Sequence, residues 1–483
     1  MTKPSVAFRA DGNSQIGLGH IHRSLALAGM LADAFDVSLL TRNPSARTRQ
    51  MVEELNGHLH VLNDACSIRD EAVNLVPLIS SFDIVVLDGY EFDGEYQRTI
   101  RSAGPGLVCI DDLHRDHFVA DVIINHAGNA QPELYDRELY TRLCLGIPYL
   151  LVKAPFLEAA RMRSGQARTP EIFISIGGAD MNNDTLFVLK RLAEKQVNLP
   201  INVVVGEAYR HHEALQQFMA TTKLHVVRYV NLSTSEMLSL MIKCAVAICA
   251  PSGEAYEYLC VGGELYVHQT ADNQSDIKRF LLDAGLAFSF GDFRVTDKRK
   301  IEATDVRQAS VVDGNSASRL LAVFNTLVYQ KRSAVRKANE GDLVLLFHWA
   351  NDPLTRRLSF NSEPISLESH RTWFNKKNAD PNAYLYIFEF ENTPVGQIRF
   401  DISESAAITY ALDEHYRGMG LGVEIVRKGI KKFRSDSGFT GPIIAYVKRE
   451  NMSSKRVFQK LGFNFVHDDK FDAEKYILNY ERY

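Results

Sequence analysis

Short apolar runs and helical patterns alternate from residue 5 to about residue 150. Runs such as residues 84–87 are apolar at every position, which is typical of strands covered on both faces of a parallel sheet. The alternation of such runs with helices predicts a parallel, doubly wound α/β sheet. The expected strands are residues 5–8, 37–41, 58–62, 84–88, 107–110 and 122–125.

A second alternating region follows a polar segment, residues 158–170, which is predicted to be a linker. Its strands are expected at residues 172–176, 201–205, 225–230, 246–249 and 265–268. Two α/β units of similar size in tandem predict two Rossmann-like domains, residues 1–160 and 170–328. A ligand is expected in the cleft between two such domains.

The pattern changes after about residue 330. The basic stretch 330–337 is interpreted as a solvated helix end or connector. Two apolar runs, 383–390 and 395–402, flank a Glu-Asn-Thr-Pro turn and predict an antiparallel hairpin. The strands and helices that follow, at 406–412, 423–433, 442–447 and 453–461, predict an α+β domain over residues 335–483.

Composition narrows the class of protein. The 483 residues carry a net charge of −4, which gives no general attraction to nucleic acid or anionic membranes. No run reaches the ~18 apolar residues of a membrane span, and the start of the chain lacks a signal-peptide pattern. The six cysteines form no C-x-x-C pair, as expected for free thiols in a reducing compartment. We expect a cytoplasmic enzyme without a nucleic-acid or membrane partner, and its oligomeric state stays open.

A loop between the first strand and the first helix carries glycines and a histidine. Gly17 and Gly19 permit close backbone approach, and His20 stands at the start of the helix. Strand ends of an open α/β sheet are where ligands bind, so His20 could face a substrate there. A tight turn without a catalytic role is the alternative.

Loops of the second unit carry candidate anion-binding groups. Gly178 and Asp180 lie between a strand and a helix, where backbone amides can hold a diphosphate, although Asp180 near a helix cap is the alternative. Ser252 could bind phosphate and Glu257 two ribose hydroxyls, since a carboxylate accepts several hydrogen bonds. A solvated helix residue is the alternative for Glu257, and a surface turn is the alternative for the polar loop that contains Asn273.

The third domain contains Arg417-x-x-Gly420-x-Gly422 between a strand and a helix. Glycines leave successive N–H groups free for phosphates, so this spacing predicts binding of an acyl-CoA pyrophosphate. Asn451, Ser454 and Phe458 follow on the next helix. The sequence His370-x-x-Trp373-Phe374 is more typical of a packed aromatic helix face than of a catalytic group.

In their order along the chain, these motifs resemble the UDP-sugar hydrolases of pseudaminic acid biosynthesis, the PseG type, which are inverting GT-B-fold relatives of MurG. The resemblance covers about residues 1–325 and rests on these residues: Arg9, Asp11, Gly17, Gly19, His20, Arg23, Asp88, Tyr90, Asp93, Asp111, Asp112, Gly177, Gly178, Asp180, Ser252, Glu257, Asn273 and Gln274. It implies that His20 is the general base that activates water, because imidazole exchanges protons near neutral pH.

The same resemblance implies substrate-binding residues and no metal. Tyr90 and Asn273 would position sugar and diphosphate, amides around Gly178 and Ser252 would stabilise the departing UDP, and Glu257 would bind the ribose. The remaining substrate-binding residues implied are Arg9, Asp11, Gly19 and Asp180. The run 251–254 departs from the small-residue run common in the family, which weakens the expected phosphate contacts there.

About residues 335–483 resemble the GNAT N-acetyltransferases, which implies acetyl-CoA as co-substrate. Backbone near Leu412 would pair with the pantetheine arm, and Asn451 would lie beside the cofactor. The pyrophosphate would be held by Arg417, Gly418, Gly420 and Gly422. Many members have a tyrosine general acid where this chain has Phe458, so water or direct intramolecular transfer could serve instead. Four residues stay open as general base: Glu389, Glu391, Asp401 and Tyr410.

Together the resemblances predict a bifunctional enzyme. Its acetyltransferase would acetylate the 4-amino group of a UDP-linked amino sugar, and its hydrolase would release UDP from the product. Three alternatives stay open: a glycosyltransferase with a sugar acceptor, an acetyltransferase for an unrelated amine, and a third domain that only senses acetyl-CoA.

Overall fold

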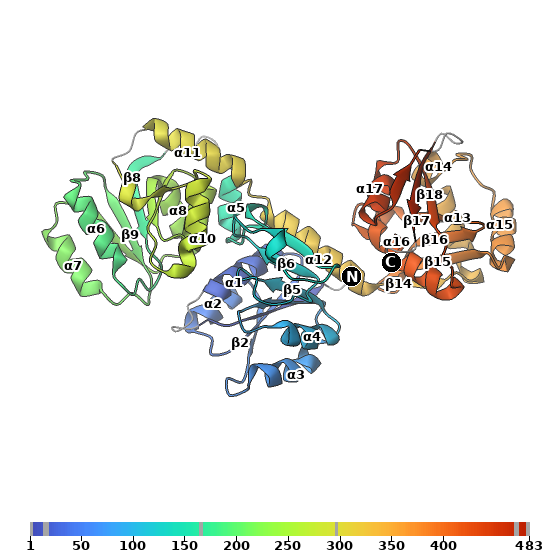
Figure 1. Cartoon of the computed structure of the whole chain (residues 1–483), viewed down its shortest axis with the longest axis horizontal. Coiled ribbons are helices and arrows are strands. Elements are labelled where there is room, and N and C mark those ends of the chain that lie inside the picture. Colours follow the sequence, from blue (N-terminus) through green and yellow to red (C-terminus); the bar gives the residue numbers. More distant parts are fainter. Residues whose placement is uncertain (1–2, 13–18, 164–167, 295–297, 468–472, 480–483) are drawn as a thin grey trace. The chain divides into compact units, whose positions relative to one another are not determined.

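The computed structural model describes residues 3–12, 19–163, 168–294, 298–467 and 473–479, without the side chains of residues 273 and 298–303. The chain forms two compact units, Thr2–Phe324 and Asn325–Tyr483. The first unit contains two parallel sheets with helices on their faces, and the second contains one mixed sheet (Figure 1).

The first sheet has seven parallel strands in the order β3-β2-β1-β4-β5-β6-β7. Its strands are β1 (Ser5–Ala10), β2 (Asp36–Thr41), β3 (His58–Val61), β4 (Ile84–Asp88), β5 (Gly106–Ile110), β6 (Val122–Asn125) and β7 (Arg142–Leu145). The helices are α1 (Gly19–Leu31), α2 (Ala46–Glu54), α3 (Ile68–Ile79), α4 (Gly94–Ser102) and α5 (Ala154–Arg161).

Neighbouring positions on the central strand of this sheet face opposite layers. Ala7 lies in a buried cluster with Leu75 of α3 and Tyr96 of α4, while Phe8 lies beside Leu25 of α1. Both faces are therefore apolar, which explains the uninterrupted hydrophobic strands. The strand order reverses between β1 and β4, and ligands bind beyond the carboxyl ends of strands at such a point.

The second sheet has six parallel strands in the order β10-β9-β8-β11-β12-β13. They are β8 (Thr169–Ser175), β9 (Ile201–Val205), β10 (Val226–Val230), β11 (Cys244–Cys249), β12 (Glu264–Val267) and β13 (Phe288–Ser289). The helices are α6 (Asp184–Glu194), α7 (His212–Thr221), α8 (Thr234–Lys243), α9 (Gly253–Val261), α10 (Ser275–Asp283), α11 (Lys298–Val311) and α12 (Ser316–Arg332). Here the order reverses between β8 and β11.

The third sheet has the order β14-β15-β16-β17-β18-β20-β19. Its strands are β14 (Ser333–Lys337), β15 (Ala383–Phe390), β16 (Thr393–Ile402), β17 (Ala406–Leu412), β18 (Ile443–Lys448), β19 (Asn464–Val466) and β20 (Ala473–Leu478). The helices are α13 (Leu343–Asn351), α14 (Pro353–Leu358), α15 (Leu367–Ala379), α16 (Leu421–Ser437) and α17 (Met452–Lys460). Phe433 of α16 and Phe458 of α17 pack on one face, and Trp349 of α13 and Phe374 of α15 on the other (Figure 1).

Strands β17 and β18 separate part of the way along their length. They are parallel neighbours, but only Ala406 and Ala407 of β17 have partners on β18, which are Ile443 and Ile444. The carboxyl-terminal half of β17 therefore has unpaired backbone groups on the side of β18. The glycine loop before α16 follows directly after this half.

The predicted fold class is confirmed, because two parallel Rossmann-like regions precede an α+β domain. One local expectation is wrong and one is correct only in part. The segment expected to be a linker is partly helical, since α5 extends to Arg161, and β8 begins at Thr169. The basic stretch contains a helix end, that of α12, but it continues into the edge strand β14, which pairs with β15. Arg336 of β14 pairs with Glu389 of β15, and Arg332 pairs with Glu391 just after β15.

Candidate active sites

A histidine–aspartate pair forms where the strand order of the first sheet reverses. His20, on the first turn of α1, has its Nδ1 2.7 Å from Oδ1 of Asp88, the last residue of β4. The Asp88 side chain is fully buried, and that of His20 is 13% exposed. An ionised carboxylate only accepts hydrogen bonds, so the 2.7 Å contact with Asp88 assigns the proton to Nδ1, although Arg23 Nη2, itself only a donor, also lies 3.1 Å from that nitrogen. In this tautomer of the neutral ring, Nε2 is the acceptor.

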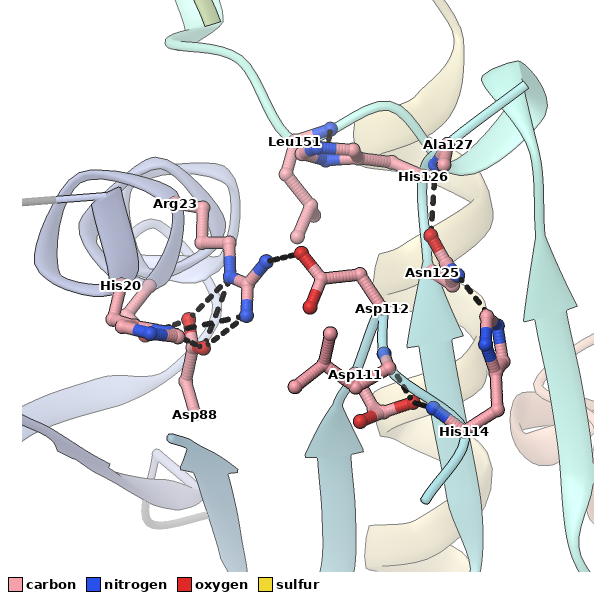
Figure 2. Close-up of polar contacts among 12 residues, drawn as sticks. His20, Arg23, Asp88, Asp111, Asp112, His114, Asn125, His126, Ala127 and Leu151 are labelled. Carbon is pink, nitrogen blue, oxygen red and sulfur yellow. Dashed lines mark hydrogen bonds and ion pairs between the residues drawn. The ribbon is translucent and has the colours of Figure 1, made fainter. Parts of the chain in front are cut away.

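Arg23 and Ser24, one turn further along α1, hold Asp88 in place. Arg23 donates to both Asp88 oxygens and also to Oδ2 of Asp112 at 2.9 Å, and Figure 2 shows its guanidinium between the two carboxylates. Ser24 Oγ donates to Asp88 Oδ2 at 2.9 Å. Burial alone would raise the pKa of Asp88, but the charge of Arg23 and the hydrogen bonds from His20 and Arg23 hold it below its ordinary value.

Tyr90 lies directly beside His20. The two rings meet edge to face with centroids 4.7 Å apart, and Tyr90 is about half exposed. The structure thus brings together two of the predicted site residues, His20 and Tyr90. It adds three polar residues of the same motifs to which sequence reasoning gave no role, Arg23, Asp88 and Asp112.

Arg9 and Asp11 belong to a different, buried network. Arg9 is 1% exposed and donates to Asp11 Oδ2 at 2.7 Å and to Glu71 at 2.7 and 3.0 Å. Glu71 also accepts from Arg42 Nε and from the Tyr96 hydroxyl. These contacts hold the end of β1 against α3 and α4, so both residues position the loop, and their contact with substrate stays a prediction.

Gly19 begins α1, and no atom of the described chain lies within 4 Å of a Cβ built there. Packing within the described chain therefore does not demand glycine at this position. Gly17 lies outside the described residues.

Other polar strand ends of the first sheet mainly fix loops. Asp111 Oδ2 accepts from the backbone of His114 at 2.9 Å, and Asn125 donates to the Tyr135 hydroxyl. His126 Nδ1 accepts from the backbone N–H of Leu151 (Figure 2). Figure 2 shows Asp111, Asn125 and His126 around Asp112.

In the second sheet, the loops after β8 and β9 touch each other. Gly178 is exposed, and a Cβ on Gly206 would come within 2.5 Å of the Gly178 backbone, so only glycine allows this approach. Asp180 accepts from the backbone of Asp184 and Thr185 at 2.7 and 2.8 Å. Its carboxylate is therefore engaged at the start of α6, and a contact with substrate stays a prediction.

Helix α9 begins at the reversal point of the second sheet. Ser252 precedes it and makes no side-chain cap, since its Oγ donates to Glu254 Oε2 at 2.8 Å. The Glu254 carboxylate accepts from its own backbone N–H at this end of α9, so an anion bound by the remaining amides would lie beside that carboxylate. Glu257, on the next turn, is mostly buried, and burial raises its pKa to about 7. The backbone of Asn273 lies in a 3₁₀ turn, Asp272–Gln274, and its side chain lies outside the described residues.

In the third sheet, the predicted glycine loop lies between β17 and α16. Gly418 and Gly420 adopt φ of +81° and +89°, a region that other residues rarely occupy, and Gly420 caps α16. A Cβ on Gly422 would lie 3.1 Å from Val457 of α17, so glycine keeps the two helices close. The loop and the helix N-terminus fit the phosphates of a CoA ester.

The other predicted CoA-binding residues lie around this loop. Leu412 ends β17 in the unpaired half of the strand. The Arg417 guanidinium donates to the Leu412 carbonyl at 3.0 Å and to Asp352, the N-cap of α14, at 2.6 Å. Asn451 caps α17 by accepting from the backbone of Ser454. Arg417 and Asn451 therefore also have structural roles.

Within the described ranges, no cluster of three or more His, Cys, Asp or Glu side chains is arranged to hold a metal ion. Nor does any described helix have the length and apolar character needed to cross a membrane.

The chain is similar to known proteins of two kinds, acetyltransferases and a sugar-nucleotide hydrolase. Residues 332–464 match the family described as acetyltransferase (GNAT) domain. An uncharacterized protein of Methanocaldococcus jannaschii is 21% identical over 95% of this chain and 96% of its own length. The UDP-2,4-diacetamido-2,4,6-trideoxy-beta-L-altropyranose hydrolase of Campylobacter jejuni is 24% identical over 46% of this chain and 75% of its own length.

Among solved structures, MurG of Acinetobacter baumannii matches 67% of this chain and 99% of its own length with a TM-score of 0.47 and 15% identity. The expected pairing is confirmed: the chain joins a homologue of a PseG-type UDP-sugar hydrolase to a GNAT acetyltransferase domain.

Proposed function

We propose that this chain is a bifunctional enzyme of pseudaminic acid biosynthesis. Its GNAT domain acetylates the 4-amino group of a UDP-linked 2-acetamido-4-amino-4,6-dideoxy sugar with acetyl-CoA. Its first unit then hydrolyses UDP-2,4-diacetamido-2,4,6-trideoxy-β-L-altropyranose to the free sugar and UDP, with inversion. The observation that carries the hydrolytic half is the His20–Asp88 pair at the reversal point of the first sheet.

In the proposed hydrolysis, His20 Nε2 takes a proton from water as the water oxygen bonds to the anomeric carbon. The bond from that carbon to the diphosphate oxygen breaks, and UDP leaves with the electron pair. Asp88 stabilises the imidazolium that forms, since it is ionised and 2.7 Å from Nδ1. The attack of water opposite the departing UDP inverts the anomeric carbon.

The proposed leaving-group site is the second sheet. The amides at the start of α9 and the exposed Gly178 loop can hold the diphosphate, because both face the carboxyl edge of the sheet where its order reverses. Glu257 would accept hydrogen bonds from the ribose, and Asn273 would position the diphosphate. Tyr90 would position the sugar beside His20.

In the proposed acetyl transfer, acetyl-CoA binds with its pyrophosphate at the glycine loop before α16. Its pantetheine arm fills the separation between β17 and β18 and bonds to the free backbone near Leu412. The amine of the sugar nucleotide attacks the acetyl carbonyl carbon, and the thiolate of CoA leaves.

Incubation of the pure chain with the UDP-4-amino sugar and acetyl-CoA tests both steps. We expect release of CoA, detected with a thiol reagent, followed by release of UDP, with the diacetamido sugar identified by mass spectrometry. His20→Ala should abolish UDP release and leave CoA release intact. If the unmodified chain releases neither CoA nor UDP, the proposal is wrong.

A further inference from the structure

The acid and base of acetyl transfer cannot be read from the GNAT motif, because Phe458 has no hydroxyl. The sequence offers three carboxylates and Tyr410 as candidates for the general base, and the contacts of these four side chains differ in the structure. Glu389 accepts from Arg336 Nε at 2.7 Å, and Glu391 pairs with Arg332. Asp401 pairs with Lys377 and Arg399, leaving Tyr410 as the candidate outside an ion pair.

Tyr410 lies in the half of β17 that has separated from β18. Its hydroxyl is 3.1 Å from Ser454 Oγ, in the first turn of α17. It is also 3.9 Å from the position of a Cβ built on Gly422, in the first turn of α16. The hydroxyl therefore stands between the starts of the two helices, directly beside the strand separation.

The rings of Tyr410 and Phe458 meet edge to face with centroids 5.8 Å apart. Phe458 is 3% exposed and lies in the apolar core of this domain. Tyr410 therefore brings a hydroxyl close to Phe458 from β17, and the Ser454 hydroxyl of α17 lies beside it.

We propose that Tyr410 is the general acid of acetyl transfer, and that Ser454 positions its hydroxyl. This inference rests on the proposed acetyltransferase function. As the amine nitrogen bonds to the acetyl carbon, the carbon–sulfur bond breaks and its electron pair goes to sulfur. Sulfur then takes the phenolic proton of Tyr410. The amine gives up its own proton to water, and the phenolate regains a proton from solvent through Ser454.

Two properties of the site suit this role. Burial raises the pKa of Tyr410, which keeps the phenol protonated near neutral pH. The bond to Ser454 holds the hydroxyl at the separated strands and can stabilise the phenolate once the proton has left.

Kinetics of the full chain test the proposal. Tyr410→Phe should lower kcat for acetyl transfer by about 10²-fold, the usual worth of a general acid, with little change in KM for acetyl-CoA. Adding Phe458→Tyr to Tyr410→Phe should restore at least about a tenth of the lost rate, because it returns the hydroxyl that many GNAT members carry at this position. Tyr384→Phe removes a tyrosine hydroxyl from β15 of the same sheet and should leave kcat unchanged.

Binding supplies a readout that needs no turnover. By calorimetry, the unmodified chain should prefer CoA over desulfo-CoA by about five-fold, the worth of one hydrogen bond, and Tyr410→Phe should abolish that preference. The proposal is overturned if Tyr410→Phe keeps its full kcat. It is equally overturned if the variant weakens CoA and desulfo-CoA to the same extent, which would indicate a structural role.

Failure of the proposed function is a separate result. A chain that transfers no acetyl group to the UDP-4-amino sugar contradicts that function. The comparison of CoA with desulfo-CoA still decides whether the Tyr410 hydroxyl contacts the sulfur.

Discussion

Replacing Asp88 by asparagine removes a charge from the His20 pair with little change of shape. Asp88 Oδ1 accepts from His20 and Arg23, and Oδ2 accepts from Ser24 and from Arg23 Nε, both at 2.9 Å. The Ser24 hydroxyl can rotate to become an acceptor, so the new amide nitrogen should turn toward Ser24, and Arg23 Nε then keeps only its bond to Oδ1. The amide carbonyl stays on His20 Nδ1, so the tautomer is kept while the negative charge is lost.

The expected fall in kcat of Asp88→Asn can be calculated from the lost negative charge of Asp88. Two unit charges about 4 Å apart attract by about 4 kcal/mol at an effective dielectric constant of about 20. That attraction builds up as His20 becomes protonated. Losing it raises the barrier by up to about 4 kcal/mol, which corresponds to a fall in kcat of up to about 10³-fold.

The assay is release of UDP from the diacetamido sugar nucleotide, with Asp112→Asn as the matched control. Asp112 pairs with Arg23 and accepts from Tyr90 but makes no hydrogen bond to His20. Asparagine keeps a carbonyl oxygen for Tyr90, so this variant should lose less than about tenfold in kcat. Urea unfolding of both variants checks that each is folded. An equal loss in the two variants would refute the role given to Asp88, as would a kcat for Asp88→Asn close to that of the unmodified chain.

Three further changes test the electrostatics and the glycine loop. Burial raises the pKa of Glu257 from 4.5 to about 7, so the contribution of this group to stability is complete below about pH 4.5 and is lost as pH rises through 7. Glu257→Gln should remove this decline in stability, which is at most about 3 kcal/mol and is measured by thermal unfolding at pH 5 and pH 8. A decline of the same size in the variant would contradict this reasoning. Glu71→Gln removes the charged partner of buried Arg9 and should lower the free energy of unfolding by about 3 kcal/mol. The control Glu95→Gln, at an exposed ion pair, should lower it by less than about 0.5 kcal/mol. Equal effects of the two variants would contradict the role given to the Arg9 network. Gly420→Ala should weaken acetyl-CoA binding measured by calorimetry, whereas Gly438→Ala, which also has positive φ but caps the other end of α16, should not.

The sequence predicts the larger elements because their hydrophobic patterns are unambiguous. Residues 84–87 of β4 and all of β11 are apolar, and both strands are buried at every position. The missed strands, among them β14 and β19, are short and largely exposed, so burial leaves no clear pattern in them. The pairing of β14 depends on Arg336 meeting Glu389, 53 residues away, which periodicity cannot reveal.

The part of the candidate site that follows directly after predicted strands could be located from the sequence. His20 and Tyr90 follow neighbouring strands, and the structure places their rings together. The Asp88 contact was not predictable, because it joins residues 68 positions apart, although an aspartate at the end of a fully apolar strand was a usable signal. The buried role of Arg9 was not predictable for the same reason, because its partner Glu71 comes from α3, 62 residues further along the chain.

The buried Arg9 network also has a consequence for how the first sheet forms. Arg9 stands opposite Leu40 and Leu87 in the register of the central strand. A slip of β1 by one residue would carry its guanidinium to the other face of the sheet and bury it without Glu71. Leaving such a charge without its partner costs about 3–5 kcal/mol. Arg9 therefore discriminates against misaligned pairings of a strand whose other inner residues, Val6, Ala7, Phe8 and Ala10, are apolar and would tolerate them.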